Sequence, residues 1–161
     1  MEVSVRGYSE GDIPSMTAIW NSIVDGGMAF PQEDPLTEAE AREFFGSQSH
    51  CGVAVYDGRV VGLYILHPNN VGRCGHICNA SYAVEKGMTN KGIGSALVED
   101  SLETAAGLGF RIMQFNAVVQ ENASAIHLYE KEGFHRLGMI PGGFRGKDGE
   151  YRTILLFYHE L

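Results

Sequence analysis

Apolar residues along the chain change their spacing several times, and each spacing predicts a different kind of element. Val3 and Val5 alternate with polar neighbours, as in a strand with one buried face. In 93–108, Ile93, Leu97, Ala105 and Leu108 share one stripe, as in an amphipathic helix, and Glu99, Asp100 and Glu103 cluster opposite. The expected strands are 3–7, 52–56, 60–66, 76–84, 110–119, 134–140 and 151–159, and the expected helices are 13–24, one opening at Thr37, 93–108 and a short one after Asn122.

Polar residues and glycines mark where these elements begin and end. Thr37 and Glu40 have the spacing of a capping box. Asp57-Gly58 between two β-rich runs predicts a tight hairpin. The remaining signals are Asp12 as the cap of helix 13–24, Asn122 and Gly133 as the two ends of the short helix, and the glycine-rich segment 141–150 as a loop.

The expected order is β-α-α-β-β-β-α-β-α-β-β, which predicts one mixed α/β domain over residues 1–161. Its single strand–helix–strand crossover gives a right-handed parallel pair if both strands share a sheet. The runs of strands at both ends of the chain favour antiparallel flanks.

Composition narrows the function classes. The net charge of −8 argues against a nucleic-acid-binding surface, and no apolar run is long enough for a membrane span. Three cysteines, an odd number, and an N-terminus unlike a signal peptide favour a cytoplasmic protein. Cys74, His76 and Cys78 lie close together, but no second ligand pair completes a site, so no metal is expected.

The segment VEKGMTNKGIGSAL places glycines between a strand and a helix, where phosphate groups bind. Gly87 and Gly92 have the spacing of a Walker A loop, but Ile93-Gly94 replace its Lys-Ser/Thr. A dinucleotide fingerprint would need Gly or Ala at the position of Leu97. A further interpretation is that the glycines only allow a tight turn and that no ligand binds there.

Two motifs together resemble those of the GNAT (GCN5-related) N-acetyltransferase superfamily. TNKGIG follows the family's pyrophosphate-loop pattern, with Thr89 where most members carry Gln or Arg. Asn122 and the later LYEKEGF match the family's second motif, and the element order agrees over nearly the whole chain. The resemblance implies the GNAT fold, with a mostly antiparallel mixed sheet, a central parallel strand pair and about four helices. It also implies acetyl-CoA as co-substrate.

The same resemblance assigns the cofactor side of the site. Tyr129 maps onto the family's general acid, which protonates the leaving thiolate; its alternative is a tyrosine of the core. Backbone groups of the fourth strand are expected to pair with the pantetheine arm. The expected cofactor-binding residues are Tyr82, Ala83, Val84, Thr89, Asn90, Lys91, Gly92, Ile93, Gly94, Ser95, Asn122 and Tyr129.

The acceptor side is marked by asparagines, because asparagine in a strand has poor β propensity and an amide that needs partners. Asn79 and Asn116, at similar depth on two strands, resemble the active-site asparagines of fungal acetyltransferases for proline analogues such as azetidine-2-carboxylate. Asn79 is expected to be catalytic alongside Tyr129, with water carrying the proton away, since no carboxylate occupies the usual place of a base. The expected substrate residues are Phe30, Asn79, Asn116 and Arg145, with Arg145 beside Phe144 in a loop, where it suits a substrate carboxylate or is a solvated charge.

The sequence thus predicts an acetyl-CoA-dependent N-acetyltransferase for a small amine or amino-acid-like acceptor. Two alternatives stay open: a phosphinothricin-type toxin acetyltransferase and a non-catalytic acyl-CoA sensor. Neither nucleic acid nor membrane is an expected partner, and a homodimer is left open.

Overall fold

The computed structural model describes residues 2–161, and within them one mixed sheet carries all seven strands in the order β1-β2-β3-β4-β5-β7-β6. Only β4 and β5 are parallel neighbours, and four α-helices complete the α/β fold predicted from the sequence. The strands are β1 (Ser4–Gly7), β2 (His50–Tyr56), β3 (Arg59–Pro68), β4 (Ile77–Val84), β5 (Ile112–Val119), β6 (His135–Arg145) and β7 (Tyr151–Glu160). The helices are α1 (Ile13–Gly26), α2 (Glu38–Gly46), α3 (Ile93–Gly107) and α4 (Ala123–Lys131), with 3-10 turns at Glu10–Asp12 and Gly72–Cys74.

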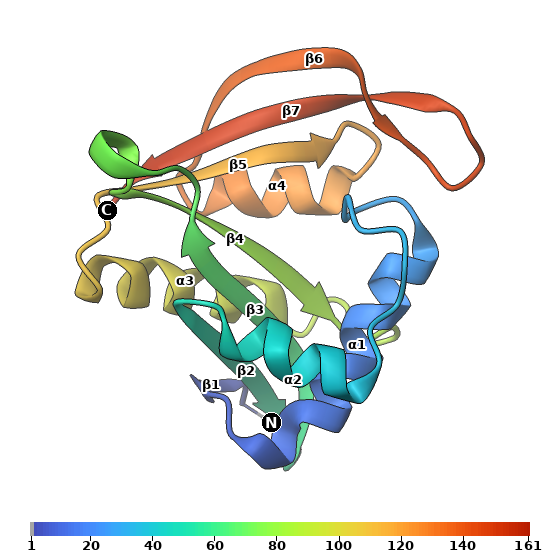
Figure 1. Cartoon of the computed structure of the whole chain (residues 1–161), viewed down its shortest axis with the longest axis vertical. Helices are drawn as coiled ribbons and strands as arrows, with labels where there is room; N and C mark the ends of the chain where they lie inside the picture. Colours follow the sequence, from blue (N-terminus) through green and yellow to red (C-terminus); the bar gives the residue numbers. More distant parts are fainter. Residues whose placement is uncertain (1) are drawn as a thin grey trace.

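Two helices cover each face of the sheet (Figure 1). On the α1/α2 face, Trp20 stacks on Phe30 with ring centroids 4.3 Å apart and packs over Leu63, Ile65 and Ala83. On the α3/α4 face, a second core gathers alternate residues of the same strands, among them Tyr64, Leu66, Cys78, Ala80, Met113 and Phe115. Because side chains alternate along a strand, the two cores fix which face each residue of β3, β4 and β5 presents.

The parallel strands β4 and β5 separate soon after they meet. They pair only at Ile77 with Ile112 and at Cys78 with Met113, and then diverge (Figure 1). At the point of divergence, Asn79 Nδ2 donates a hydrogen bond to the carbonyl oxygen of Gln114 at 2.9 Å. Beyond it, the sides of β4 and β5 that face each other lack a strand partner, so the sheet opens at its centre.

Within the segment 141–150, only residues 146–150 form the loop that its glycines suggested. Strand β6 continues to Arg145 and pairs with β7 on both sides of an irregularity between Ile140 and Phe144. Gly142 has φ +68°, and a Cβ on Gly143 would lie 2.6 Å from Ile154. Gly142 and Gly143 therefore form a bulge within the strand, a common place for glycine in antiparallel pairs.

Two aspartates also differ from expectation. Asp12 precedes α1, but its carboxylate accepts hydrogen bonds from Arg6 at 2.7 Å and from the Ser9 backbone instead of capping the helix. This pairing lowers the pKa of Asp12 to about 2. Asp100 does not lie on the outer face of α3, because it accepts a hydrogen bond from the Tyr64 hydroxyl at 2.7 Å.

The tip of the β6–β7 hairpin is docked on the segment that joins α1 to α2. Arg145 forms an ion pair with Glu33. The Lys147 backbone N–H donates to the Gly27 carbonyl at 3.3 Å, and Lys147 Nζ donates to the Asp25 carbonyl at 2.9 Å. This contact holds the α1–α2 segment against the open centre of the sheet.

Gly27 allows the hairpin tip to pack closely against the end of α1. It ends α1 with φ +67°, and a Cβ on it would lie 2.4 Å from Lys147 Cβ. We expect Gly27→Ala to lower the free energy of unfolding by about 2–3 kcal/mol, since backbone strain adds to a clash. Gly58→Ala is the matched control, because Gly58 also has positive φ but open space around it. Equal losses in the two variants, measured by urea unfolding, would contradict the docking role.

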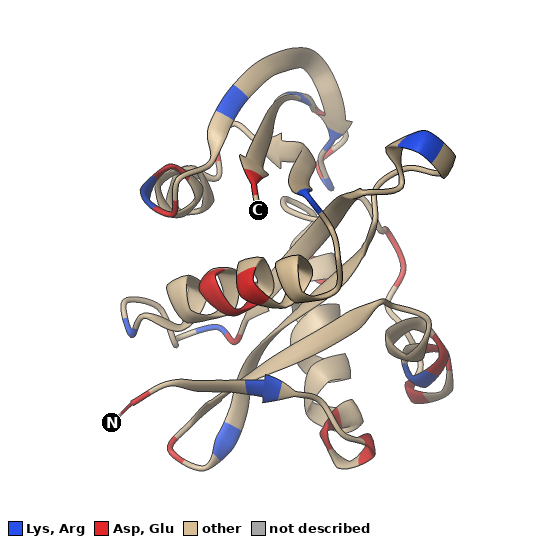
Figure 2. Cartoon of the chain, turned by 90° about the vertical axis from the view of Figure 1, so that its left-hand side faces the viewer, with Lys and Arg blue, Asp and Glu red and all other residues tan. Residues whose placement is uncertain are grey.

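No helix within residues 2–161 is both long and apolar enough to cross a membrane. In the view of Figure 2, basic residues are spread over separate elements, and acidic residues lie among them.

Candidate active site

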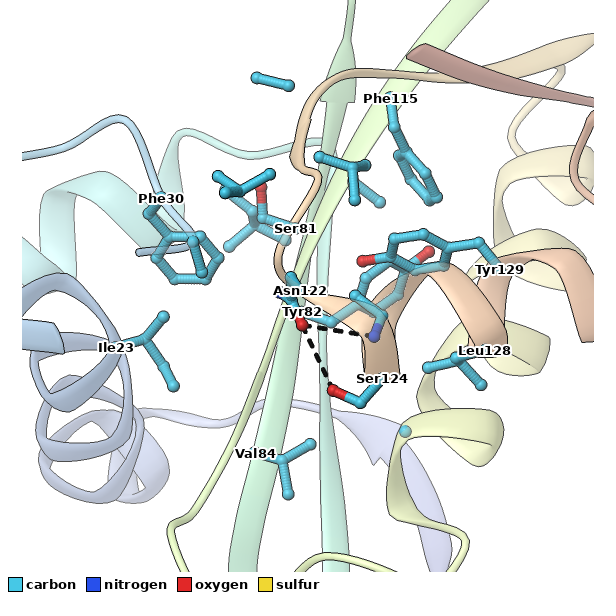
Figure 3. A pocket seen from close by; sticks show the side chains of 18 of the residues that line it. Ile23, Phe30, Ser81, Tyr82, Val84, Phe115, Asn122, Ser124, Leu128 and Tyr129 are labelled. Atoms are coloured by element: carbon cyan, nitrogen blue, oxygen red, sulfur yellow. Dashed lines mark hydrogen bonds between the residues drawn. The ribbon is translucent and has the colours of Figure 1, made fainter. Parts of the chain in front are cut away.

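A cavity of about 1200 Å³ occupies the opening between β4 and β5 and extends to both faces of the sheet. Its wall on the α1/α2 face comes from α1, the α1–α2 segment, the end of α2 and the end of β3. Its wall on the other face comes from the loop before α3, the start of α3 and α4. Figure 3 shows Ile23 and Phe30 on one side and Phe115, Tyr129 and Leu128 on the other.

The loop between β4 and α3 is shaped by left-handed backbone conformations. Gly87, Asn90 and Gly92 have φ of +83°, +62° and +77°. Gly92 is the N-cap of α3 and supplies no side-chain hydrogen bond, so the N–H groups of the first turn face outward at the positive end of the helix. Such a terminus binds phosphate groups.

Gly94 lies where α3 and α4 come close together. A Cβ there would lie 3.0 Å from Leu128 Cδ2 of α4, so its absence lets α3 and α4 approach each other. A Cβ on Gly92 would meet no protein atom within 4 Å, so at that position the positive φ requires glycine.

Most of the predicted cofactor residues line the cavity, and two do not. Ala83 is buried against the α1/α2 core, on the opposite face from Tyr82 and Val84. Lys91 lies over the ring of Tyr56, 5.6 Å from its centroid. The predicted cofactor residues that do line the cavity are Tyr82, Val84, Thr89, Asn90, Gly92, Ile93, Gly94, Ser95, Asn122 and Tyr129.

Tyr129 extends from α4 into this cavity. Its ring centroid is 4.5 Å from that of Phe115 and 6.1 Å from that of Tyr82 (Figure 3). Burial raises the pKa of its phenol well above the ordinary value, which keeps the hydroxyl protonated at neutral pH. The Tyr82 hydroxyl is hydrogen bonded to Ser101 Oγ at 2.7 Å, whereas no side chain of residues 2–161 bonds that of Tyr129.

The three asparagines occupy different environments. Asn79 is half-buried, on the α1/α2 face of β4, and binds Gln114 with its amide nitrogen. Asn116 is exposed, and its amide is bound to Asn69 at 2.6 Å and to Gln114 at 3.1 Å; like Asn79, it lines the cavity. Asn122 caps α4 by accepting from the Ala125 N–H at 3.3 Å (Figure 3).

The structure brings Phe30 to the cavity but not Arg145. Phe30 is buried and forms part of the wall from the α1–α2 segment. Arg145 lies in β6, outside the cavity lining, with its guanidinium on Glu33. Phe144 is buried with Val119 and Ile154 instead of closing the site.

His67 and Gln48 line the same wall, and the sequence reading did not select them. Alternation along β3 carries the face of Leu63 and Ile65 on to His67, which is opposite Asn79 in the register with β4. The hairpin at Asp57-Gly58 and this alternation were the sequence features that could have placed His67 in the site. Gln48 Nε2 donates to the Phe44 carbonyl at 3.0 Å, and its buried Oε1 has no partner among the described residues.

Comparison with known proteins agrees with this geometry. The model of the acetyltransferase (GNAT) family matches residues 16–134. An N-acetyltransferase of Schizosaccharomyces pombe is 28% identical over 166 residues, which cover 91% of this chain and 79% of that protein. YwnH of Bacillus subtilis, provisionally named a phosphinothricin acetyltransferase, is 28% identical and covered over 99% of both chains. The structure of a GCN5-related N-acetyltransferase from Kribbella flavida matches with a TM-score of 0.90 and 32% identity, over 99% of this chain and 98% of that one. The chain therefore belongs to the GNAT family of acetyltransferases.

Proposed function

We propose that this acetyltransferase moves the acetyl group of acetyl-CoA directly to the amino group of a small, amino-acid-like acceptor. The observation that carries the proposal is the cavity through the open centre of the sheet, which joins an uncapped helix N-terminus on one face to amide side chains on the other. One molecule can enter from each face, and the two meet between β4 and β5.

On the α3/α4 face, the first-turn N–H groups of Ile93, Gly94 and Ser95 receive the pyrophosphate. The β5-facing side of β4 lacks a strand partner from Asn79 onward, so the pantetheine arm adds to it as a strand would. This route brings the thioester to the point where the strands diverge, beside Tyr129.

Tyr129 donates its proton to the sulfur as the C–S bond breaks. A general acid must hold its proton until the leaving group forms, and the raised pKa of Tyr129 ensures that it does. The aromatic rings packed around the phenol lower the local polarity, which strengthens its interaction with a developing thiolate.

On the α1/α2 face, Phe30 and Phe44 supply apolar walls. Asn79 uses Nδ2 on Gln114, which leaves Oδ1 to accept a hydrogen bond from the acceptor amine. An amino-acid-like acceptor is supported by the provisional name of YwnH and by the resemblance to acetyltransferases for proline analogues. The cytoplasmic location and the homodimer stay predictions.

A panel of amines with acetyl-CoA tests the proposal. The panel contains azetidine-2-carboxylate, phosphinothricin and L-methionine sulfoximine, with a lysine-rich peptide as the comparison. We expect loss of thioester absorbance with at least one small acceptor and one N-acetylated product per thioester consumed, identified by mass spectrometry. Thioester absorbance avoids thiol reagents, which would also modify the exposed Cys74. Binding of acetyl-CoA without turnover, or preference for the peptide, would contradict the proposal.

A further inference from the structure

His67 lines the cavity from the α1/α2 face of the sheet. It follows Ile65 on the α1/α2 face of β3 and lies directly opposite Asn79 in the antiparallel register. The Ser49 backbone N–H donates to the Leu66 carbonyl at 2.9 Å, which brings the neighbouring Gln48 to the same wall. His67, Gln48 and Asn79 thus line the cavity on this face.

A backbone contact fixes which nitrogen of His67 carries a proton. Nδ1 lies 3.0 Å from the carbonyl oxygen of Pro68. A carbonyl oxygen only accepts, so Nδ1 is the N–H of the neutral ring, and Nε2 carries the lone pair. The ring is therefore held in the tautomer that can take a proton at Nε2.

No other side chain of the lining can serve as the base on this face. Among the described residues that line the cavity, none carries a carboxylate. Tyr82 and Tyr129 hold their protons, and His127 and Lys131 come from α4, across the opening. On the strands beside His67, His50 packs against Tyr64 and Cys78 lies in the α3/α4 core, both on the opposite face. Cys51 of β2 is on the same face as His67, but burial raises the pKa of its thiol, so it keeps its proton. Glu33 in the α1–α2 segment is paired with Arg145.

We propose that His67 is the general base of this enzyme, which takes the amine proton at Nε2. The proposal rests on the proposed acetyl transfer. The amine lone pair forms the new C–N bond to the thioester carbonyl carbon while one N–H proton passes to His67. The C–S bond then breaks, its electron pair stays on sulfur, and Tyr129 gives sulfur a proton. His67 and Tyr129 regain their starting states through solvent, so the sum is amine plus thioester to amide plus thiol.

The test compares wild type with His67→Gln and His67→Asn, with the acceptor of the panel that wild type acetylates fastest. We expect kcat/KM for the acceptor to fall by roughly 10²–10⁴, while the acetyl-CoA Kd stays unchanged. His135→Gln is the matched control, because His135 is exposed on β6, outside the cavity lining. In His67→Gly, added imidazole should restore part of the lost rate, which a merely structural histidine would not allow.

The pH profile separates the base from the acceptor's own ionisation. Wild type should show one ionisation that moves when the acceptor is changed and a second that stays fixed, and His67→Gln should lose the fixed one. A folded His67→Gln with wild-type kcat/KM, or with the fixed ionisation retained, would overturn the base but not the acetyl transfer. A wild-type enzyme that acetylates nothing in the panel would overturn the proposed function and the base with it.

Discussion

Tyr129→Phe is expected to lower kcat by roughly 10²–10⁴ while leaving the fold and the acetyl-CoA Kd unchanged. The substitution removes one hydroxyl that bonds no other side chain of residues 2–161. The ring keeps its contacts with Phe115, Phe134 and Phe157. Without the phenol, the thiolate must leave without a proton donor beside it. Steady-state kinetics at saturating substrates measure the loss.

Tyr64→Phe is the control for this prediction. The Tyr64 hydroxyl is also partly buried and bonds Asp100 at 2.7 Å and Thr104 at 3.3 Å, outside the cavity lining. Its loss should cost about 1–2 kcal/mol of stability and leave turnover intact. If Tyr129→Phe instead resembles Tyr64→Phe, with lower stability and wild-type turnover, Tyr129 belongs to the core alone.

Gly92→Ala is expected to raise the acetyl-CoA Kd at least tenfold, about 1.4 kcal/mol. Gly92 sits at φ +77° as the N-cap of α3, a conformation that alanine resists. A shift at this residue turns the first-turn N–H groups away from the pyrophosphate. The Cβ also enters space that is open to the cavity, where the phosphates approach. Isothermal titration with acetyl-CoA measures the change.

Gly109→Ala is the control for this prediction, because it carries the same cost of positive φ but lies outside the proposed binding site. Gly109 has φ +93° just after the other end of α3, and a Cβ there would meet nothing within 4 Å. Both variants should lose about 1–2 kcal/mol of stability, but only Gly92→Ala should lose affinity. Equal affinities in the two variants would show that the pyrophosphate does not bind at the N-terminus of α3.

The order of elements was predictable because local chemistry determined it. Thr37 and Glu40 form the expected capping box, and Asn122 caps α4 as expected. Asp57 and Gly58 both have positive φ in the predicted hairpin turn. Each of these signals acts within a few residues, so it can be recognised from the sequence alone.

The features that sequence reading missed depend on distant partners. Gly142 and Gly143 form a bulge because β7 pairs with β6 on both sides of it. Arg145 finds Glu33, which lies more than a hundred residues earlier in the chain. His67 lies beside Asn79 because of the register between β3 and β4. The alternation of residues along β3 indicates which face His67 is on, but no sequence motif identifies it as a site residue. Asn116 was placed on the correct strand, but its amide partner Asn69 comes from the segment after β3.

The most direct test of the proposed acetyl-CoA site is a crystal structure of the enzyme with acetyl-CoA bound. We expect the pyrophosphate on the N–H groups of Ile93, Gly94 and Ser95, the pantetheine along β4, and the thioester sulfur within hydrogen-bond distance of the Tyr129 hydroxyl. The carbonyl carbon should then be accessible from the α1/α2 face, toward Asn79 and His67. A pantetheine arm outside the opening between β4 and β5, or a sulfur out of reach of Tyr129, would contradict the account.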